Sequence, residues 1–543
     1  MTNGIFNVPV PSNEPILAYG PGSQEKRVLK AKIVEMKSQQ IEIPLIIGGE
    51  HVKTGNTVEC RCPHETKLLL GSYHKAGEKE IDQAIQAALA ARPAWASMSW
   101  EARASIFLKA AELLAGPYRP ILNAATMLCQ SKTVFQAEID SACELIDFYR
   151  FNPYYMQQIY HQQPQSSAAC WNYVEQRPLE GFIFAVTPFN FTSIAGNLPT
   201  SPAMMGNVVL WKPASSAVYT AYFIMQLLKE AGLPDGVINM VPGPGASVGD
   251  PVMASPHLAG VHFTGSTEVF QNMWKTIGNN ISKYKTYPRI VGETGGKDFI
   301  FAHNSSNLDA LTTAIIRGAF EYQGQKCSAA SRAYIPKSIW SELKSKLISS
   351  VKRIKMGSPE DFTNFMCAVI DRAAFNTITS YIDYAKKSTD AEFITGGTYD
   401  DSKGYFIEPT LILTSNPKFK LMEEEIFGPV LTIYIYPDDK FEETLYLCDE
   451  TSPYALTGAI FATDRAAIIQ ATEILTHAAG NFYINDKPTG AVVGQQPFGG
   501  SRASGTNDKA GSVINLQRWV TPRTIKENFL PPLDFPYSHM QEK

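Results

Sequence analysis

Between residues 181 and 301, the pattern of apolar and polar positions alternates between two periodicities. Short unbroken apolar runs, such as "FIFAV" (182–186) and "VVLW" (208–211), are typical of strands buried on both faces. The segment "SAVYTAYFIMQLLKEAG" (216–232) follows the second run and places its apolar residues at helical spacing. Strands that alternate with helices in this way predict a parallel sheet with crossover helices, and therefore the α/β fold class.

Helical periodicity also precedes this block, and a second block follows it. The segments 78–95 and 100–117 are helical in pattern, and the second ends at a Gly-Pro stop. From Asn307 to about residue 500, strands and helices alternate again, and the first helix, capped by Asn307, leads to Cys327. The tail after Gly500 has no periodicity of its own, so we expect it to pack on something else, such as a partner subunit.

Length, composition and charge narrow the class of protein. A chain of 543 residues exceeds one compact core, and 44% hydrophobic with 18% charged residues is typical of a globular protein. A net charge of −4 without a long basic run argues against nucleic acid, and the apolar runs are too short to span a membrane. Cys60 and Cys62 lack a companion pair at zinc spacing, so we expect no metal site.

Polar residues and glycines follow several of the predicted strands. Asn190, Lys212 and Glu293 each stand at the end of an apolar strand, and Gly265 and Ser266 open a predicted helix. Open α/β sheets bind ligands at the carboxyl ends of their strands, and a helix N-terminus offers free N–H groups to a phosphate. Taken one at a time, these residues are equally consistent with a turn, a solvated lysine or a structural ion pair.

The stretch "EYQGQKCSAASR" (321–332) contains a cysteine that suits either a nucleophile or a buried thiol. A nucleophilic cysteine must ionise, and Lys326 beside Cys327 either lowers the thiol pKa or faces solvent. Taken alone, a buried structural thiol is the commoner fate. The nearby "GGK" (295–297) lacks the spacing of a phosphate loop, which excludes a kinase, and no histidine motif accompanies Cys327 to favour a cysteine hydrolase.

The order of these motifs along the chain is more specific than any one of them. The series "PFN", "WKP", "FTGS", "ETGGK", "GQKC", "EEIFGP" and "PFGG" resembles the aldehyde dehydrogenase superfamily, from about residue 45 to the C-terminus. Three further segments are similar to its Δ1-pyrroline-5-carboxylate dehydrogenase family: "NEPILAYGPGS" (13–23), "QAEIDSACELIDFYRFN" (136–152) and "FYINDKPTGAVVGQQPFGGSRASGTNDK" (482–509).

This resemblance implies a fold and a division into domains. We expect a Rossmann-like NAD-binding domain at 1–293, with an oligomerisation hairpin near 165–181, and a catalytic α/β domain at 294–497. Residues 498–543 would form an oligomerisation tail that joins the hairpin in a small β element.

The resemblance also implies roles for individual residues. Cys327 would be the nucleophile, Glu293 the general base, and Asn190 would stabilise the oxyanion together with the Cys327 N–H. The NAD site would comprise Thr187, Lys212, Gly265, Ser266, Thr267, Glu268, Val269, Glu425 and Phe427. Phe270 and Thr294 depart from the superfamily pattern, which usually has glycine and leucine there, and Phe270 leaves the pyrophosphate position open.

The implied substrate site would comprise Glu144, Phe191, Ser328, Gly490, Ala491 and Phe498. Backbone groups of Gly490 and Ala491 would bind the α-carboxylate and amino group, and Ala491 lacks the serine hydroxyl of some relatives. Phe191 and Phe498 would either sandwich the aliphatic chain or be plain core residues.

The implied function is NAD-dependent oxidation of L-glutamate γ-semialdehyde, formed from Δ1-pyrroline-5-carboxylate, to L-glutamate in proline degradation. A dehydrogenase of another semialdehyde and a catalytically silent binding protein on the same fold stay as alternatives. We expect a homo-oligomer, specifically a dimer. The N-terminus shows no targeting pattern, which favours the cytoplasm, whereas eukaryotic family members work in the mitochondrial matrix.

Overall fold

Two seven-stranded sheets form the body of the computed structural model, which describes residues 4–541. The first sheet is parallel from β11 to β9 and is extended by the antiparallel strands β2 and β3. The predicted parallel sheet is therefore confirmed. In spatial order its strands are β11 (Arg289–Glu293), β10 (Leu258–Thr264), β7 (Phe182–Val186), β8 (Val208–Lys212), β9 (Ile238–Met240), β2 (Leu45–Ile47) and β3 (Glu50–Val52).

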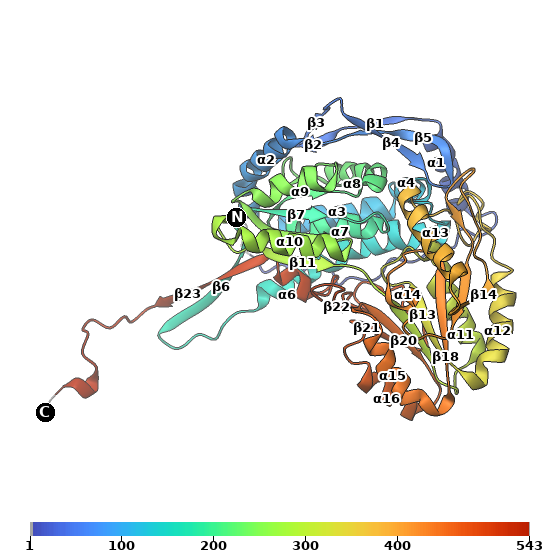
Figure 1. The fold of residues 1–543 in the computed structure, drawn as a ribbon. Coiled ribbons are helices and arrows are strands. Elements are labelled where there is room, and N and C mark those ends of the chain that lie inside the picture. The colour runs from blue at the N-terminus through green and yellow to red at the C-terminus, as the bar shows by residue number, and fades with distance from the viewer. Residues whose placement is uncertain (1–3, 542–543) are drawn as a thin grey trace.

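Helices cover this sheet and form the N-terminal part of the body (Figure 1). The two helices predicted before residue 120 are present, and the second ends at Gly116 as its Gly-Pro stop indicates. The helices are α1 (Gln24–Lys37), α2 (Glu78–Ser97), α3 (Trp100–Ala115), α4 (Arg119–Gln130), α5 (Val134–Ala137), the π-helix η1 (Glu138–Glu144), α6 (Leu145–His161), α7 (Thr192–Met204), α8 (Val218–Ala231), α9 (Gly245–Ala254) and α10 (Thr267–Asn279).

The second sheet is parallel except for its edge strand β14. Its strands, in spatial order, are β14 (Ala391–Thr395), β17 (Thr410–Thr414), β18 (Val430–Tyr436), β13 (Ala330–Pro336), β12 (Asp298–Ala302), β20 (Thr457–Phe461) and β21 (Asn481–Ile484). Its helices are α11 (Leu308–Phe320), α12 (Lys337–Val351), α13 (Arg372–Lys387), α14 (Lys420–Glu423), α15 (Phe441–Glu450) and α16 (Arg465–Ile474). The Asn307 side chain accepts from the Asp309 and Ala310 N–H groups, so the predicted cap of α11 is confirmed.

Smaller elements complete the body. The thiols of Cys60 and Cys62 are buried in β4, as expected for strand cysteines, and residues 4–541 contain no cluster suited to a metal ion. A three-stranded sheet combines β1 (Ile41–Ile43), β5 (Glu65–His74) and β4 (Thr57–Cys62), and two short pairs join β15 (Tyr399–Asp400) to β16 (Phe406–Ile407) and β19 (Tyr454–Ala455) to β22 (Ser501–Arg502). Short 3₁₀ turns cover Ser215–Ala217, Ile281–Lys283, Glu321–Gly324, Asp438–Lys440 and Ser538–Met540.

An arm that ends in the C-terminus leaves the body on the side of the first sheet, beside α10 and β11 (Figure 1). It pairs β6 (Cys170–Pro178) with β23 (Val520–Asn528) in antiparallel register along their whole length. β6 thus takes its partner strand from the tail and not from a hairpin of its own. The apolar side chains of Trp171, Leu530 and Phe535 are exposed on the arm and the tail beyond it.

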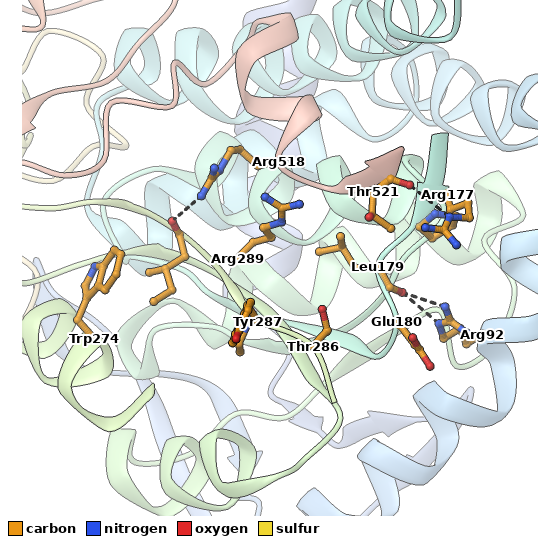
Figure 2. A pocket seen from close by; sticks show the side chains of 13 residues that line it. Arg92, Arg177, Leu179, Glu180, Trp274, Thr286, Tyr287, Arg289, Arg518 and Thr521 are labelled. Atoms are coloured by element: carbon orange, nitrogen blue, oxygen red, sulfur yellow. Dashed lines mark hydrogen bonds between the residues drawn. The ribbon is translucent and has the colours of Figure 1, made fainter. Parts of the chain in front are cut away.

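The root of the arm is fixed by the buried amide of Asn207. Its Oδ1 accepts from the Leu179 N–H at 2.9 Å, and its Nδ2 donates to the Trp519 carbonyl at 2.8 Å. Beside this root lies a cavity of about 790 Å³. Figure 2 shows that arginines surround it, namely Arg92, Arg177, Arg289 and Arg518.

The first part of the tail packs on its own chain before it reaches the arm. Thr506 donates its N–H to the Gly292 carbonyl at 2.9 Å, and Thr294 donates its N–H to Ser504 at 3.0 Å. The helix α17 (Val513–Gln517) then packs against α6.

The domain boundaries at 293 and 497 stay a prediction. Within the described part of the chain, every helix is too short or too polar to cross a membrane.

Candidate active site

Two cavities meet at Cys327. The first, of about 970 Å³, lies along the carboxyl ends of β7, β8, β10 and β11. The second, of about 400 Å³, lies between α6, α11 and the loop that contains Gly490. We refer to them as the sheet-edge cavity and the loop cavity. Because Cys327 lines both, its thiol can face two different ligands at once.

A left-handed turn presents Cys327 to the two cavities. Gln323 has φ 55° and Gly324 has φ 65°, and a side chain at Gly324 would collide with a neighbouring carbonyl. A non-glycine residue in this region is strained, so the surroundings must hold it in place. The Gln323 amide does so, because its Nε2 donates to the Ser131 and Ala368 carbonyls at 3.1 and 2.8 Å.

A fully buried ion pair lies behind this turn. The ammonium of Lys132 donates to Asp140 Oδ2 at 2.7 Å, and both side chains are inaccessible to solvent. Lys132 also lies over the rings of Phe191 and Tyr322, 4.1 and 4.5 Å from their centres. Asp140 accepts from the first two N–H groups of α7 at 3.0 and 2.8 Å, so it caps that helix. No motif or periodicity in the sequence points to this pair.

The Cys327 thiol lies where its ionised form is disfavoured. Burial, followed by the carboxylates of Glu293, Asp298 and Glu425, raises its pKa well above the ordinary value. The expected alternative of a solvent-facing Lys326 is wrong, because Lys326 is buried and donates to a glutamate, Glu321, at 3.1 Å. The thiol is therefore neutral in the free protein, and a role as nucleophile would require it to lose its proton.

Glu293 ends β11 and lies close enough to influence the Cys327 thiol. It lines a third cavity, of about 30 Å³, which shares Glu144 and Phe498 with the loop cavity. Burial raises the pKa of Glu293 to about 8, while the Lys509 ammonium lowers it. A carboxyl group with a pKa near neutrality is suited to accept a proton from water.

Asn190 and Cys327 line the sheet-edge cavity together. Asn190 is buried, and its Nδ2 donates one hydrogen bond, to the Gln325 carbonyl, at 3.2 Å. A primary amide has two N–H groups, so this bond fixes the amide and leaves a second N–H for an oxyanion in the cavity.

The sheet-edge cavity gathers almost all of the residues expected at the cofactor. Thr267 does not line it; the Thr267 hydroxyl instead donates to the Ala503 carbonyl at 3.1 Å and accepts from the Gly295 N–H at 3.2 Å. The residues that do line it are Thr187, Lys212, Gly265, Ser266, Glu268, Val269, Glu425 and Phe427.

The donors of this cavity fit a dinucleotide. Burial lowers the pKa of Lys212 to about 8, and its ammonium has only a long bond, of 3.5 Å, to the carbonyl of the next residue, so a ribose hydroxyl would satisfy it. Ser266 caps the N-terminus of α10, where free N–H groups suit a pyrophosphate. Phe270 leaves this space open, because its ring stacks on Phe263 in the core.

Two residues of the "EEIFGP" motif, Glu425 and Phe427, also line this cavity. Glu425 accepts from the Gly296 N–H at 2.8 Å, and burial raises its pKa to about 7. Phe427 has a left-handed backbone, φ 56°, and packs edge-on against Phe189 with ring centres 5.8 Å apart. Both side chains are thereby fixed beside the nucleophile.

The loop cavity brings together all six residues expected at the substrate. Its lining includes Glu144, Phe191, Ser328, Gly490, Ala491 and Phe498. The hydroxyls of Ser328 and Thr489 share a hydrogen bond of 2.8 Å, which joins the nucleophile segment to the glycine loop. Ser193 donates to Glu144 at 2.9 Å, and burial raises the pKa of Glu144 to about 8.

Sequence reasoning missed one wall of this cavity. Asn13, Glu14 and Ile16 line it from an N-terminal segment without helix or strand. Their only signal in the sequence is that they belong to the family-like segment "NEPILAYGPGS". A segment without periodicity gives no indication of where it packs.

Comparisons with known proteins agree with this geometry. The sequence profile of the aldehyde dehydrogenase family matches residues 51–525. The mitochondrial Δ1-pyrroline-5-carboxylate dehydrogenase of Dictyostelium discoideum is 54% identical over 98% of this chain and 96% of its own length. The human mitochondrial enzyme of the same name is 47% identical over 98% of this chain and 94% of its own.

Solved structures give the same result. The pyrroline-5-carboxylate dehydrogenase of Mycobacterium tuberculosis, determined with bound NAD, superimposes with a TM-score of 0.97 at 49% identity, over the whole of both chains. The Thermus 1-pyrroline-5-carboxylate dehydrogenase with bound NAD has a TM-score of 0.90 at 30% identity, over 97% of this chain and 100% of its own. The chain therefore belongs to the aldehyde dehydrogenase family, and within it to the Δ1-pyrroline-5-carboxylate dehydrogenases.

Proposed function

We propose that this chain oxidises L-glutamate γ-semialdehyde, the open form of Δ1-pyrroline-5-carboxylate, to L-glutamate with NAD in proline degradation. The observation that supports this most directly is that Cys327 lines both the sheet-edge cavity and the loop cavity. Relatives at 47–54% identity share one enzyme name, which disfavours another semialdehyde. The nucleophile, base and amide are all present, which disfavours a silent binding protein.

The reaction begins at the Cys327 thiol. Its sulfur attacks the aldehyde carbon. As the C–S bond forms, the thiol proton passes to a water molecule and so to solvent. The carbonyl oxygen becomes an oxyanion, which the free N–H of Asn190 and the backbone N–H of Cys327 would stabilise. Fixed donors of this kind contribute substantially because they need no reorganisation during the reaction.

The cofactor residues would hold NAD along the sheet edge. Lys212 would bind the adenosine ribose, the first turn of α10 the pyrophosphate, and Glu425 with Phe427 the nicotinamide end. When bound, NAD supplies the hydride acceptor that turns the thiohemiacetal on Cys327 into a thioester. The protein's part is to hold the aldehyde carbon between the two cavities and to exclude bulk water.

Glu293 completes the cycle by hydrolysing the thioester. As a carboxylate it accepts a proton from water, and the resulting hydroxide attacks the thioester carbon. The C–S bond then breaks, L-glutamate leaves, and the sulfur regains a proton. Glu293 lines the small cavity, which shares Phe263 and Thr264 with the sheet-edge cavity and Glu144 and Phe498 with the loop cavity, and this cavity would hold the water.

The glycine loop would recognise the amino-acid end of the substrate. Gly490 has φ 95°, a conformation that suits glycine, and it lines the loop cavity. Backbone N–H groups at Gly490 and Ala491 would bind the α-carboxylate, since Ala491 has no hydroxyl. The rings of Phe191 and Phe498 would pack on either side of the aliphatic chain.

We further propose that the chain forms a homodimer through its arm. Apolar side chains that are exposed on the arm, such as Trp171 and Leu530, would be covered by the partner. The cavity at the arm root, which Arg177 and Thr521 of the arm strands help to line, gathers four arginines and suits carboxylates (Figure 2). The Dictyostelium and human relatives are named mitochondrial. We therefore propose the matrix for a eukaryotic source and the cytoplasm otherwise, which cell fractionation tests.

Replacing Cys327 with alanine removes the nucleophile, so we expect NADH formation from glutamate semialdehyde to fall by at least about 10³-fold. The absorbance of NADH in the steady state measures this rate. The affinity for NAD, measured by fluorescence titration, should stay within threefold of that of the unaltered enzyme. Cys170→Ala, which changes a half-buried cysteine of the arm, serves as the control and should keep full activity. Turnover by Cys327→Ala within tenfold of the unaltered enzyme would falsify the proposal.

The Glu293 carboxyl has a pKa of about 8 and acts only when ionised. We therefore expect thioester hydrolysis to rise about tenfold per pH unit below pH 8 and to level off above it. Glu293→Gln should release one NADH per subunit in a rapid burst and then turn over about 100-fold more slowly. Glu473→Gln, at an exposed carboxylate on α16, should behave as the unaltered enzyme. Unchanged steady-state turnover in Glu293→Gln would exclude Glu293 as the base.

Mass photometry tests the arm as the assembly face. We expect the unaltered protein to have twice the 59.8 kDa mass of the chain. Trp171→Glu combined with Leu530→Glu places charge on the apolar arm and should shift the population to single chains. A monomeric unaltered protein, or a charged variant that stays dimeric, would contradict this proposal.

A further inference from the structure

Residues 7–19, which we call the N-terminal strap, run across α4, η1 and α6 without forming a helix or strand. Three residues of the strap line the loop cavity, on which Gly490, Ala491 and Cys327 also open. These are Asn13, Glu14 and Ile16. The substrate cavity is therefore closed in part by the beginning of the chain, far in sequence from the rest of the site.

Buried charges hold the strap in place. The Glu14 carboxylate accepts from Arg119 at 2.5 Å and from Arg150 at 2.7 Å. The Glu14 N–H donates to Asp147 Oδ1 at 2.7 Å, and the Leu17 N–H donates to a further carboxylate, that of Glu138, at 2.8 Å. A segment with this many charge-assisted bonds has a defined path, although it has no regular structure.

Asn13 connects the strap to the glycine loop. Its Nδ2 donates to Asp147 Oδ2 and to the Val493 carbonyl, both at 2.8 Å. Its Oδ1 accepts from Gln495 Nε2 at 2.9 Å. Both donors and the acceptor of one amide are thus used, and two of the three bonds go to the loop that contains Gly490.

We propose that Asn13 is a positioning residue for substrate specificity, which holds the loop 489–495 in the form that binds the α-carboxylate and amino group. This inference rests on the proposed function. Ser328 fixes one end of the loop through Thr489. Asn13 fixes the other end, through Gln495 and through Val493, which lies three residues after Gly490. Release of Asn13 would let the backbone N–H groups of Gly490 move out of line with a carboxylate.

The consequence is a selective loss of affinity. A substrate with an α-amino carboxylate depends on the loop, whereas a simple aldehyde such as propanal reaches Cys327 without it. Asn13→Ala should therefore raise KM for glutamate semialdehyde about tenfold, the cost of one or two lost hydrogen bonds. We expect kcat to stay within twofold, and neither KM for NAD nor kcat/KM for propanal should change by more than twofold.

Asn7→Ala is the matched control. Asn7 lies on the same strap and accepts from Gln157 Nε2 at 2.9 Å, but it does not touch the loop. It should leave both substrates unaffected. Gln495→Ala removes the loop side of the contact and should raise KM for the semialdehyde in the same selective way. The double variant Asn13→Ala with Gln495→Ala should lose less than the product of the two separate effects.

Steady-state kinetics with both aldehydes separates the possible outcomes. If the unaltered enzyme oxidises propanal but not glutamate semialdehyde, the proposed function fails first. If it oxidises both and Asn13→Ala keeps its KM for the semialdehyde, the role of Asn13 is wrong. An equal loss with both aldehydes would also overturn it, because it would show that the strap only supports the fold. Should Asn13→Ala not fold, Gln495→Ala, at an exposed position, tests the same contact from the loop side.

Discussion

The ion pair between Lys132 and Asp140 is the constraint on which the site depends. Moving two charges into the interior costs several kcal/mol for each ion, and removal of one partner from such a pair costs about 3–5 kcal/mol. Here the cost is offset because Asp140 also caps α7 and Lys132 lies over the rings of Phe191 and Tyr322. The pair thus holds the Phe191 ring, which lines the loop cavity, against Tyr322 in the turn that presents Cys327.

The same burial sets the chemistry. It raises the pKa of the Cys327 thiol, of Glu293 and of Glu144, so the free site contains neutral acids at their most reactive positions. A dry site strengthens each fixed donor, including the Asn190 amide that the Gln325 carbonyl holds. In the proposed mechanism, substrate and cofactor would approach from separate cavities, so neither would need to pass the other to reach the sulfur.

Much of this could be predicted from the sequence, because its signals are local. Apolar runs indicated the strands of the first sheet, the Asn307 cap marked α11, and the ordered motifs indicated residues that the two cavities do bring together. Two residues are exceptions. The Thr267 side chain bonds to Gly295 and Ala503 and does not line the sheet-edge cavity, and Glu293 lines the small third cavity instead of either larger one.

Partners that no periodic pattern specifies could not be predicted, whether they are far apart or close in the sequence. β6 takes β23 as its partner across more than three hundred residues. Lys132 and Asp140 flank the short helix α5, and Asp140 stands in a π-helix, which has no periodic signature. The strap that contains Asn13 has no regular structure, and Lys326 finds Glu321 only because a tight turn brings them together. Each of these contacts depends on tertiary packing.

The central claim is that Cys327 lies between a cofactor cavity and a substrate cavity. The most direct test is a crystal structure of Cys327→Ala with NAD and L-glutamate. The account predicts the nicotinamide in the sheet-edge cavity and the glutamate in the loop cavity. The α-carboxylate should lie within hydrogen-bond distance of the backbone N–H groups of Gly490 and Ala491, and the γ-carboxylate should point at residue 327. Glutamate bound outside the loop cavity, or with its γ-carboxylate turned away from residue 327, would contradict it.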